Sequence, residues 1–172
     1  FDEAGDDWFF AASLLNALHT TTKQFVVEDE FLFEEGDDLD TTTLLETERI
    51  LRRIGIFSNV SVRYRQVGQD SADIEVLTQD RWSLRPAILF GTGGGITNIG
   101  AKLEDVNLFG TATQAMGYGL YRTENDIGWE GMAQITQRRL LRSEVNMIAA
   151  LKANRFRTDQ TLQFEKPYRT MS

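Results

Sequence analysis

The second half of the sequence alternates apolar and polar side chains over strand-length segments, and this pattern limits the possible folds more than any other feature. Beyond Arg81 no helical periodicity is apparent. In IGWEGMAQIT, Trp129 and Ile135 share one face, whereas Glu130 and Gln134 share the other. The segments RWSLRPAILFG, NIGAKLED and RFRTDQTLQFEK alternate in the same way. A period of two predicts antiparallel β-strands with one apolar and one polar face.

Strands of this kind occur in two architectures. Outer-membrane barrels need them, because lipid leaves no backbone group unpaired and the strands must close into a barrel with one face to lipid. A soluble β-sandwich alternates as well. Two features favour the barrel: charged residues on the polar faces, and aromatic residues near strand ends, as interfacial girdles require, namely Trp82, Tyr121, Trp129 and Tyr168.

The first half of the sequence has a different residue pattern. TTTLLETERILRRI, residues 41–54, has apolar residues at helical spacing, and Glu48 can pair with Arg52 one turn later. Asp40 or Thr43 can cap its first amides, with Thr43 and Glu46 matching a capping box, and Gly55 suits a left-handed stop. We therefore expect a helix over residues 41–54.

Shorter elements surround this helix. We expect an extended segment in residues 10–19, a short helix over residues 22–33, and two strands in IFSNVSVRYRQV and DIEVLT. The resulting order of strand, helix, helix, strand, strand indicates an α+β layer, in which helices cover one face of a small sheet.

Charge and composition exclude several classes of protein. The net charge is −8, and residues 1–80 carry 18 acidic and 6 basic side chains, whereas residues 81–172 carry 8 and 12. An acidic first half argues against nucleic acid as a partner. The absence of cysteine excludes a disulfide framework, a thiolate metal site and a cysteine nucleophile.

The glycine-rich block LFGTGGGITNIGAKLEDVNLFG fits no phosphate-binding motif. Ala101 stands where a P-loop needs lysine, the dinucleotide spacing fails, and a strand follows instead of a helix. We expect a hairpin of strands 82–91 and 97–109, whose pairing the glycines loosen. His19 is the lone histidine and no pair of acids stands out, so we expect no enzyme, cofactor or metal site.

Several segments resemble a known family. The pieces FLFEEGDDLD, ETERILRRIGIFSNVSV and ADIEVLTQDRWSLRP resemble a POTRA (polypeptide-transport-associated) domain. LEDVNLFGTATQ and QFEKPYRTMS resemble early barrel strands of the bacterial surface-antigen superfamily, which includes barrel assembly and translocation proteins. The resemblance covers residues 12–172.

This resemblance implies an architecture and a location. Residues 1–80 would form a periplasmic POTRA-like β-α-α-β-β domain, and residues 81–172 an antiparallel β-meander that supplies the first strands of an incomplete transmembrane β-barrel in the bacterial outer membrane. The strands are too few for a whole barrel of this family, so we expect a piece of a longer protein. The implied partners are extended polypeptide clients, outer-membrane lipid and accessory periplasmic proteins, and the implied task is insertion or translocation of polypeptides.

Exposed strand edges are the predicted contact sites, because an extended client can add to their free N–H and C=O groups by β-augmentation. The candidate residues lie in two strands: Ser61, Val62 and Arg63 in the first half, and Ala87, Ile88 and Leu89 in the second. Pro86 cannot donate to a ladder and therefore suits an edge strand. The alternative is a soluble α+β binding or adhesion module whose second half is a β-sandwich.

Overall fold

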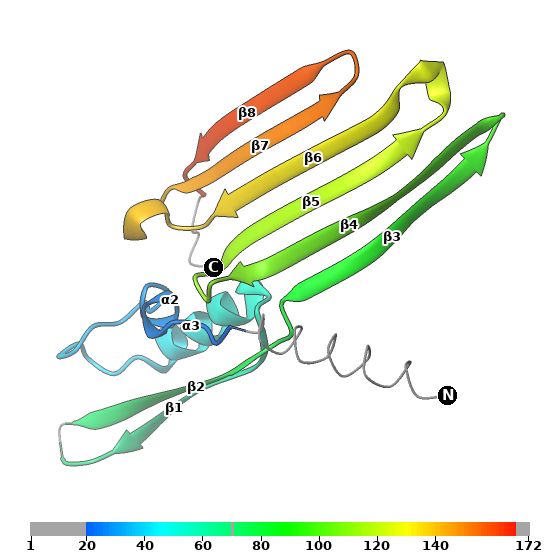
Figure 1. The fold of residues 1–172 in the computed structure, drawn as a ribbon. Coiled ribbons are helices and arrows are strands. Elements are labelled where there is room, and N and C mark those ends of the chain that lie inside the picture. The colour runs from blue at the N-terminus through cyan, green and yellow to red at the C-terminus, as the bar shows by residue number, and fades with distance from the viewer. Residues whose placement is uncertain (1–19, 70, 168–172) are drawn as a thin grey trace, which may run out of the picture. The chain divides into compact units, whose positions relative to one another are not determined.

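The computed structural model describes residues 20–69 and 71–167 and divides the chain into two compact units (Figure 1). We call residues 22–82 the helical unit, and residues 83–167, together with residues 20 and 21, the sheet unit. The predicted extended segment in residues 10–19 and the aromatic residue Tyr168 lie outside the described residues.

The predicted long helix is confirmed as α3, Thr41–Ile54. Its N-cap is Asp40, whose Oδ1 accepts a hydrogen bond from the Thr42 amide at 2.9 Å. The capping box proposed at Thr43 is wrong, since the Thr43 hydroxyl instead donates to Asp40 Oδ2 at 2.8 Å. Gly55 ends the helix with φ of 80°, the left-handed conformation expected there.

The earlier helix is shorter than the predicted residues 22–33. It is α2, Gln24–Glu28, and a turn at residues 29–30 follows it. Acidic side chains at its C-terminal end, in the sequence Glu28-Asp29-Glu30, oppose the helix dipole, and no basic residue lies in its last turn. This charge pattern explains why the apolar spacing does not extend the helix.

A hairpin completes the helical unit. β1, Phe57–Gln66, pairs antiparallel with β2, Ala72–Asp80, which confirms both predicted strands. Helix α3 packs on β1. The core consists of buried residues from α2, α3 and β1 and from the segment between α3 and β1: Val26, Leu44, Leu51, Ile56, Phe57 and Val60.

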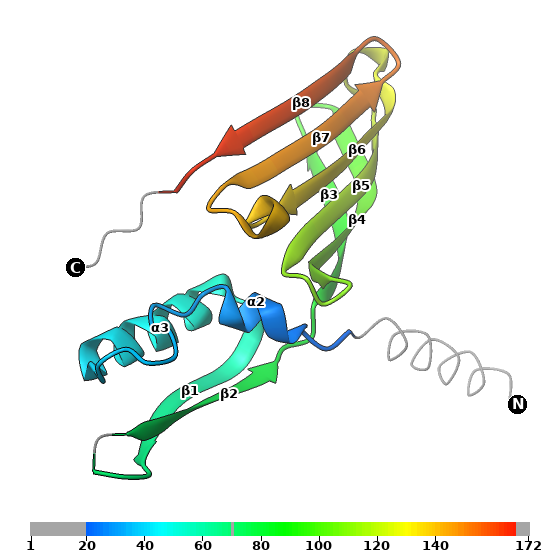
Figure 2. The same ribbon diagram turned by 90° about the vertical axis from the view of Figure 1, so that its left-hand side faces the viewer.

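The sheet unit is an antiparallel meander in which each strand pairs with its neighbours in sequence (Figures 1 and 2). The sequence analysis anticipated four of its strands and did not single out β5 and β7. The strands are β3 Leu84–Gly93, β4 Ile96–Leu108, β5 Thr113–Arg122, β6 Gly128–Gln137, β7 Asn146–Asn154 and β8 Thr158–Glu165. Short 3-10 turns, Glu124–Asp126 and Leu140–Arg142, lie in two of the connections.

The glycine-rich block forms the β3–β4 hairpin. Gly94 and Gly95 make its two-residue turn with φ of 59° and 80°, values that residues with a side chain rarely adopt. The register runs without a shift from Leu84–Asp105 to Gly93–Ile96, and the looseness attributed to the glycines stays a prediction. The shift in β4 lies further on, between Asp105 and Leu108.

The sandwich alternative requires two sheets packed face to face. Residues 83–167 instead form one sheet, in the order β3-β4-β5-β6-β7-β8, and this sheet is not closed between β3 and β8. Among the described residues, no helix has the length and hydropathy needed to cross a membrane.

Candidate functional site

One face of the six-stranded sheet is apolar and open. Residues directly opposite each other in an antiparallel pair share a face, so the register assigns Phe90 and Ile99 to the same face, as it does Tyr121 and Trp129. Ile88 is 85% exposed, Phe90 70% and Trp129 69%. The apolar face carries these large side chains: Ile88, Phe90, Ile99, Leu103, Tyr121, Trp129, Ile135, Leu151, Leu162 and Phe164.

Aromatic residues lie near one end of the apolar face. The rings of Tyr121 and Trp129 meet edge to face with centroids 5.4 Å apart, beside the turn between β5 and β6. Trp82, the other described aromatic residue of the predicted girdle, lies before β3 and is 41% exposed.

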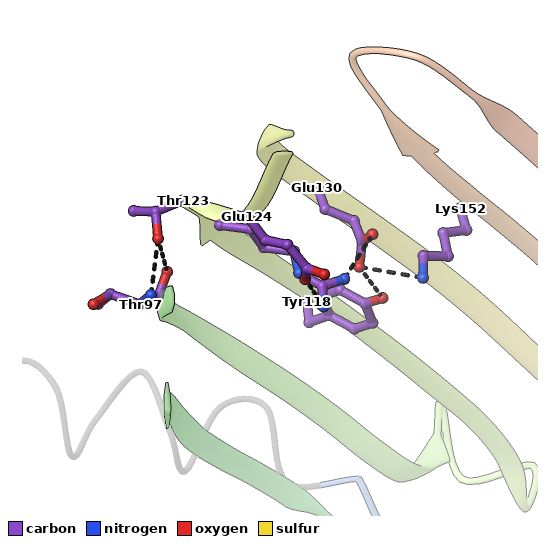
Figure 3. A network of polar contacts seen from close by, with 7 residues as sticks. Thr97, Tyr118, Thr123, Glu124, Glu130 and Lys152 are labelled. Atoms are coloured by element: carbon purple, nitrogen blue, oxygen red, sulfur yellow. Dashed lines mark hydrogen bonds and ion pairs between the residues drawn. The ribbon is translucent and has the colours of Figure 1, made fainter. Parts of the chain in front are cut away.

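The opposite face carries a charged network (Figure 3). Glu130 of β6 is 5% exposed and accepts a hydrogen bond from the Tyr118 hydroxyl at 2.9 Å. Lys152 Nζ of β7 lies 3.2 Å from the same carboxylate, and Arg122 lies 3.5 Å from both Glu130 and Glu124. The two cations balance the two carboxylates, so the buried charge of Glu130 is compensated.

A second polar cluster lies on the same face. Lys102 Nζ is 2.9 Å from Glu104, and the Gln114 amide donates to Glu104 at 2.6 Å. These contacts join β4 to β5 and leave the carboxylate fully engaged. No group of three or more potential metal ligands occurs within the described residues. This face therefore carries paired charges and hydrogen-bonded polar side chains.

The predicted site in the second half lies on an edge strand. Within the described residues β3 pairs with β4 alone. Ile88 points to the apolar face, whereas Ala87 and Leu89 point to the charged face, opposite Lys102 and Gly100. Pro86 is also in β3, as expected of an edge strand. Every second residue of such a strand directs its N–H and C=O away from the neighbouring strand, toward an added strand.

The predicted site in the first half is more restricted. The backbone N–H of Val62 donates to Glu48 Oε2 of α3 at 2.9 Å, and Arg52 Nη2 donates to the Val60 carbonyl at 2.9 Å. Glu48 and Arg52 also pair with each other at 2.7 Å, which confirms the predicted ion pair. We call this arrangement the edge clamp. It occupies the backbone groups of Val60 and Val62 that an added strand would need, and the role of Ser61, Val62 and Arg63 in client binding stays a prediction.

Sequence reasoning found the Glu48–Arg52 pair but missed its contact with β1, since i,i+4 spacing reveals a partner on the helix and not one on a strand. It also missed the network of Tyr118, Glu130 and Lys152. The alternation in β6 assigned Glu130 to the polar face, whereas pairing Glu130 with residues of β5 and β7 requires the register.

The segment NLFG forms the turn between β4 and β5. Asn107 is buried, and its Oδ1 accepts a hydrogen bond from the Ala112 amide at 2.8 Å. Phe109 and Gly110 both have positive φ, 56° and 70°. A buried asparagine that accepts a hydrogen bond across the turn therefore fixes a tight connection, and this explains the asparagine of the segment.

The fold of this chain is similar to that of a solved structure. The crystal structure of BamA from Haemophilus ducreyi lacking POTRA domains 1–3 aligns over 77% of this chain with a TM-score of 0.64 and 18% sequence identity. The two chains share a fold. The alignment spans 25% of the BamA chain, so this chain corresponds to about a quarter of that protein. No protein-family model matches the sequence, and no curated protein matches it.

Proposed function

We propose that this chain contributes the first strands of an outer-membrane β-barrel, preceded by a periplasmic POTRA-like domain, in a protein that inserts or translocates polypeptides. The two-faced sheet is the observation that carries the proposal. Its apolar face leaves Ile88, Phe90 and Trp129 largely exposed, and its other face holds compensated charges. Lipid on one side and water on the other suit these two faces.

Strand length supports a membrane-spanning role. Strands β3, β5 and β6 each have 10 residues and β7 has 9, whereas a tilted transmembrane strand needs about 9–11 residues. The BamA likeness supports the same architecture at the level of the fold. The POTRA-like assignment of residues 1–80 rests on the sequence resemblance and on the order of α2, α3, β1 and β2.

The edge of β3 that has no partner strand within the described residues supports a role in handling polypeptides. An extended client adds to such an edge through main-chain hydrogen bonds, which require little of its sequence. We propose Ala87, Ile88 and Leu89 as the first contact, and the β1 edge at Ser61, Val62 and Arg63 as a second contact that the edge clamp limits.

Site-specific photocrosslinking of the full-length protein in cells tests this function. A crosslinking amino acid at position 88 is expected to capture polypeptides in transit, because position 88 lies in β3, the strand that pairs with β4 alone within the described residues. Ile99 provides a matched control, since it is also exposed on the apolar face but belongs to β4, which is paired on both sides. Leu45, 64% exposed on α3, controls for exposure alone.

The comparison of positions decides the outcome. Capture of clients at position 88 well above positions 99 and 45 supports β-augmentation at β3. Equal capture at 88 and 99 means that the apolar face, and not the strand edge, makes the contact. No capture above position 45 at either position contradicts the proposed function.

A further inference from the structure

Two turns at one end of the six-stranded sheet each expose a large apolar side chain. Phe109, in the turn between β4 and β5, is 70% exposed, and Leu141, in the turn between β6 and β7, is 92% exposed. Both turns lie at the end of the sheet at which β3 begins (Figure 1). The Thr113 hydroxyl, directly after the first turn, donates a hydrogen bond to Gln137 Oε1, directly before the second. The two turns are therefore neighbours along this end of the sheet.

Hydrogen bonds and backbone conformation fix the exposed side chains in place. The Leu140 N–H donates to the Val145 carbonyl at 2.7 Å, and the Ser143 N–H donates to the Leu140 carbonyl at 3.0 Å. Leu141 has φ of 53° and Phe109 has φ of 56°, a left-handed conformation that is uncommon for bulky residues. Backbone strain of this kind persists only where the surrounding structure enforces it, and it occurs often at functional sites. The exposure of both side chains is therefore a built feature of the turns.

The second turn is also cationic. Residues 138–145 carry three basic residues and one acidic residue: Arg138, Arg139, Arg142 and Glu144. Glu144 pairs with Lys166, at the end of β8, at 2.6 Å. Each guanidinium group has five N–H donors, whose geometry suits the oxygens of a phosphate group. The turn therefore combines an exposed leucine with groups that bind phosphate.

This combination matches the headgroup layer of a bilayer better than a protein partner. A specific protein interface buries about 800 Å² on each partner, whereas the turns offer two separate projecting side chains. At a membrane surface, apolar side chains enter the boundary of the acyl region while arginine side chains stay at the level of the phosphates. Basic residues close to a membrane surface are attracted to anionic lipid.

We propose that residues 109–112 and 138–145, which we call the turn pair, bind the surface of the periplasmic leaflet. Phe109 and Leu141 enter the headgroup layer, and the arginines of the second turn bind the phosphates of anionic phospholipid. The inference rests on the proposed function, which places the apolar face of this sheet against lipid. It adds a second contact with lipid, at the end of the sheet that begins directly after the helical unit.

Fluorescence quenching in proteoliposomes tests where the turn pair lies. A single cysteine at position 109 or 141 of the full-length protein, with its other cysteines replaced by serine, carries the fluorophore. The vesicles contain phosphatidylcholine, phosphatidylglycerol and a lipid brominated close to its headgroup. Position 45 controls for exposure alone, because Leu45 is 64% exposed on α3. Stronger quenching at positions 109 and 141 than at position 45 supports the proposal, and equal quenching overturns it.

Position 99, on the apolar face of β4, separates this inference from the proposed function. Quenching at position 99 but not at positions 109 and 141 overturns the inference and leaves the proposed function standing. Quenching at none of these positions contradicts both. Quenching at positions 109 and 141 alone supports binding of the turn pair to lipid and contradicts a membrane-spanning sheet.

Arg138→Gln/Arg142→Gln tests the role of lipid charge. For the native chain, phosphatidylglycerol is expected to raise the unfolding temperature above that in phosphatidylcholine alone, because a ligand of the folded state stabilises it. The double variant is expected to lose more than half of this increase. Arg49→Gln/Arg53→Gln removes the same charge from α3 and is expected to keep the increase. Equal losses in the two double variants overturn the proposal in favour of general electrostatic attraction.

Two controls complete this experiment. The unfolding temperature of each variant in phosphatidylcholine alone, measured by heat-dependent gel mobility, establishes that a lost increase does not reflect lost folding. Photocrosslinking from position 141 in cells, with mass spectrometry of the product, identifies what the turn meets. Capture of phospholipid supports the proposal, whereas capture of a protein partner, or of a second copy of this chain, without phospholipid overturns it.

Discussion

Asp40 shows how one residue sets the start of α3 and makes it sensitive to pH. Hydrogen bonds from the Thr43 hydroxyl and from the Thr42 amide lower the pKa of the Asp40 carboxyl below its ordinary value. A carboxyl with a lowered pKa in the folded state stabilises that state above its unfolded pKa, about 3.9. This contribution is lost as the pH falls through the folded pKa.

The Asp40 prediction concerns thermal unfolding of the full-length protein, followed by the helical circular-dichroism signal. Asp40→Ala is expected to unfold at lower temperature than the native chain at pH 7, and this difference is expected to shrink toward pH 3. Asp40→Asn keeps an N-cap acceptor that does not titrate. Its unfolding temperature is therefore expected to exceed that of Asp40→Ala by an amount that is independent of pH. If the difference in unfolding temperature between the native chain and Asp40→Ala did not change with pH, this role of the carboxylate would be contradicted.

Gly100 marks a close approach between strands β4 and β5. A Cβ atom added there would collide with the Gly119 carbonyl oxygen and lie 2.8 Å from Leu120 Cα, so the backbone would have to shift. Gly100→Ala is therefore expected to destabilise the protein by about 1–3 kcal/mol. Gly119→Ala, where a Cβ meets nothing within 4 Å, is expected to be neutral or stabilising by up to about 1 kcal/mol.

Urea unfolding of the full-length protein in detergent measures both glycine variants. The prediction is a lower midpoint for Gly100→Ala and no decrease for Gly119→Ala. Equal midpoints for the two variants would mean that the close approach at Gly100 does not limit pairing of β4 with β5.

At the scale of elements, the sequence predicted bounds best where the apolar spacing and the residues at both ends of an element indicate the same bounds. Helix α3 has apolar spacing, Asp40 at its start and Gly55 at its end, so its bounds were predicted correctly. Helix α2 has the spacing but carries acids at its C-terminal end, and its predicted length was wrong. Strands β5 and β7 are rich in glycine, alanine and methionine, and their weak contrast between faces hid the alternation.

The edge clamp gives a prediction at this scale. Glu48→Ala/Arg52→Ala frees the Val62 N–H and the Val60 carbonyl, so a crosslinker at position 62 is expected to capture more extended polypeptide than in the native chain. Glu46→Ala/Arg49→Ala removes a neighbouring ion pair of 2.9 Å whose partners, within the described residues, make no hydrogen bond to β1, and it is expected to leave capture at position 62 unchanged.

The double variants also separate exposure of the edge from loss of stability. Equal increases in capture at position 62 in both double variants would point to a destabilised helix. No increase in the Glu48→Ala/Arg52→Ala variant would mean that the edge clamp does not restrict the β1 edge.

At the scale of the whole molecule, alternation predicted which side chains share a face, but it did not predict which neighbours they meet. Glu130 could be assigned to the polar face from its own strand, whereas its contacts with Tyr118 and Lys152 come from three strands brought together by register. Long-range pairing of this kind leaves little trace in a single sequence.

The central claim is that the six-stranded sheet faces lipid on one side and water on the other. Cysteine labelling along β4 tests it most directly, with any cysteine outside residues 1–172 replaced by serine, since these residues contain none. Single cysteines would replace Ile99, Ala101 and Leu103 on the apolar face, and Asn98, Lys102 and Glu104 on the charged face, in the full-length protein in outer-membrane vesicles.

We expect a strict alternation of labelling and quenching among these six variants. The fluorophore at positions 99, 101 and 103 would be quenched by brominated lipid, and these cysteines would resist a water-soluble maleimide. Positions 98, 102 and 104 would show the reverse. Equal labelling by the maleimide at all six positions, with no quenching by lipid, would contradict the claim that this sheet lies in a membrane.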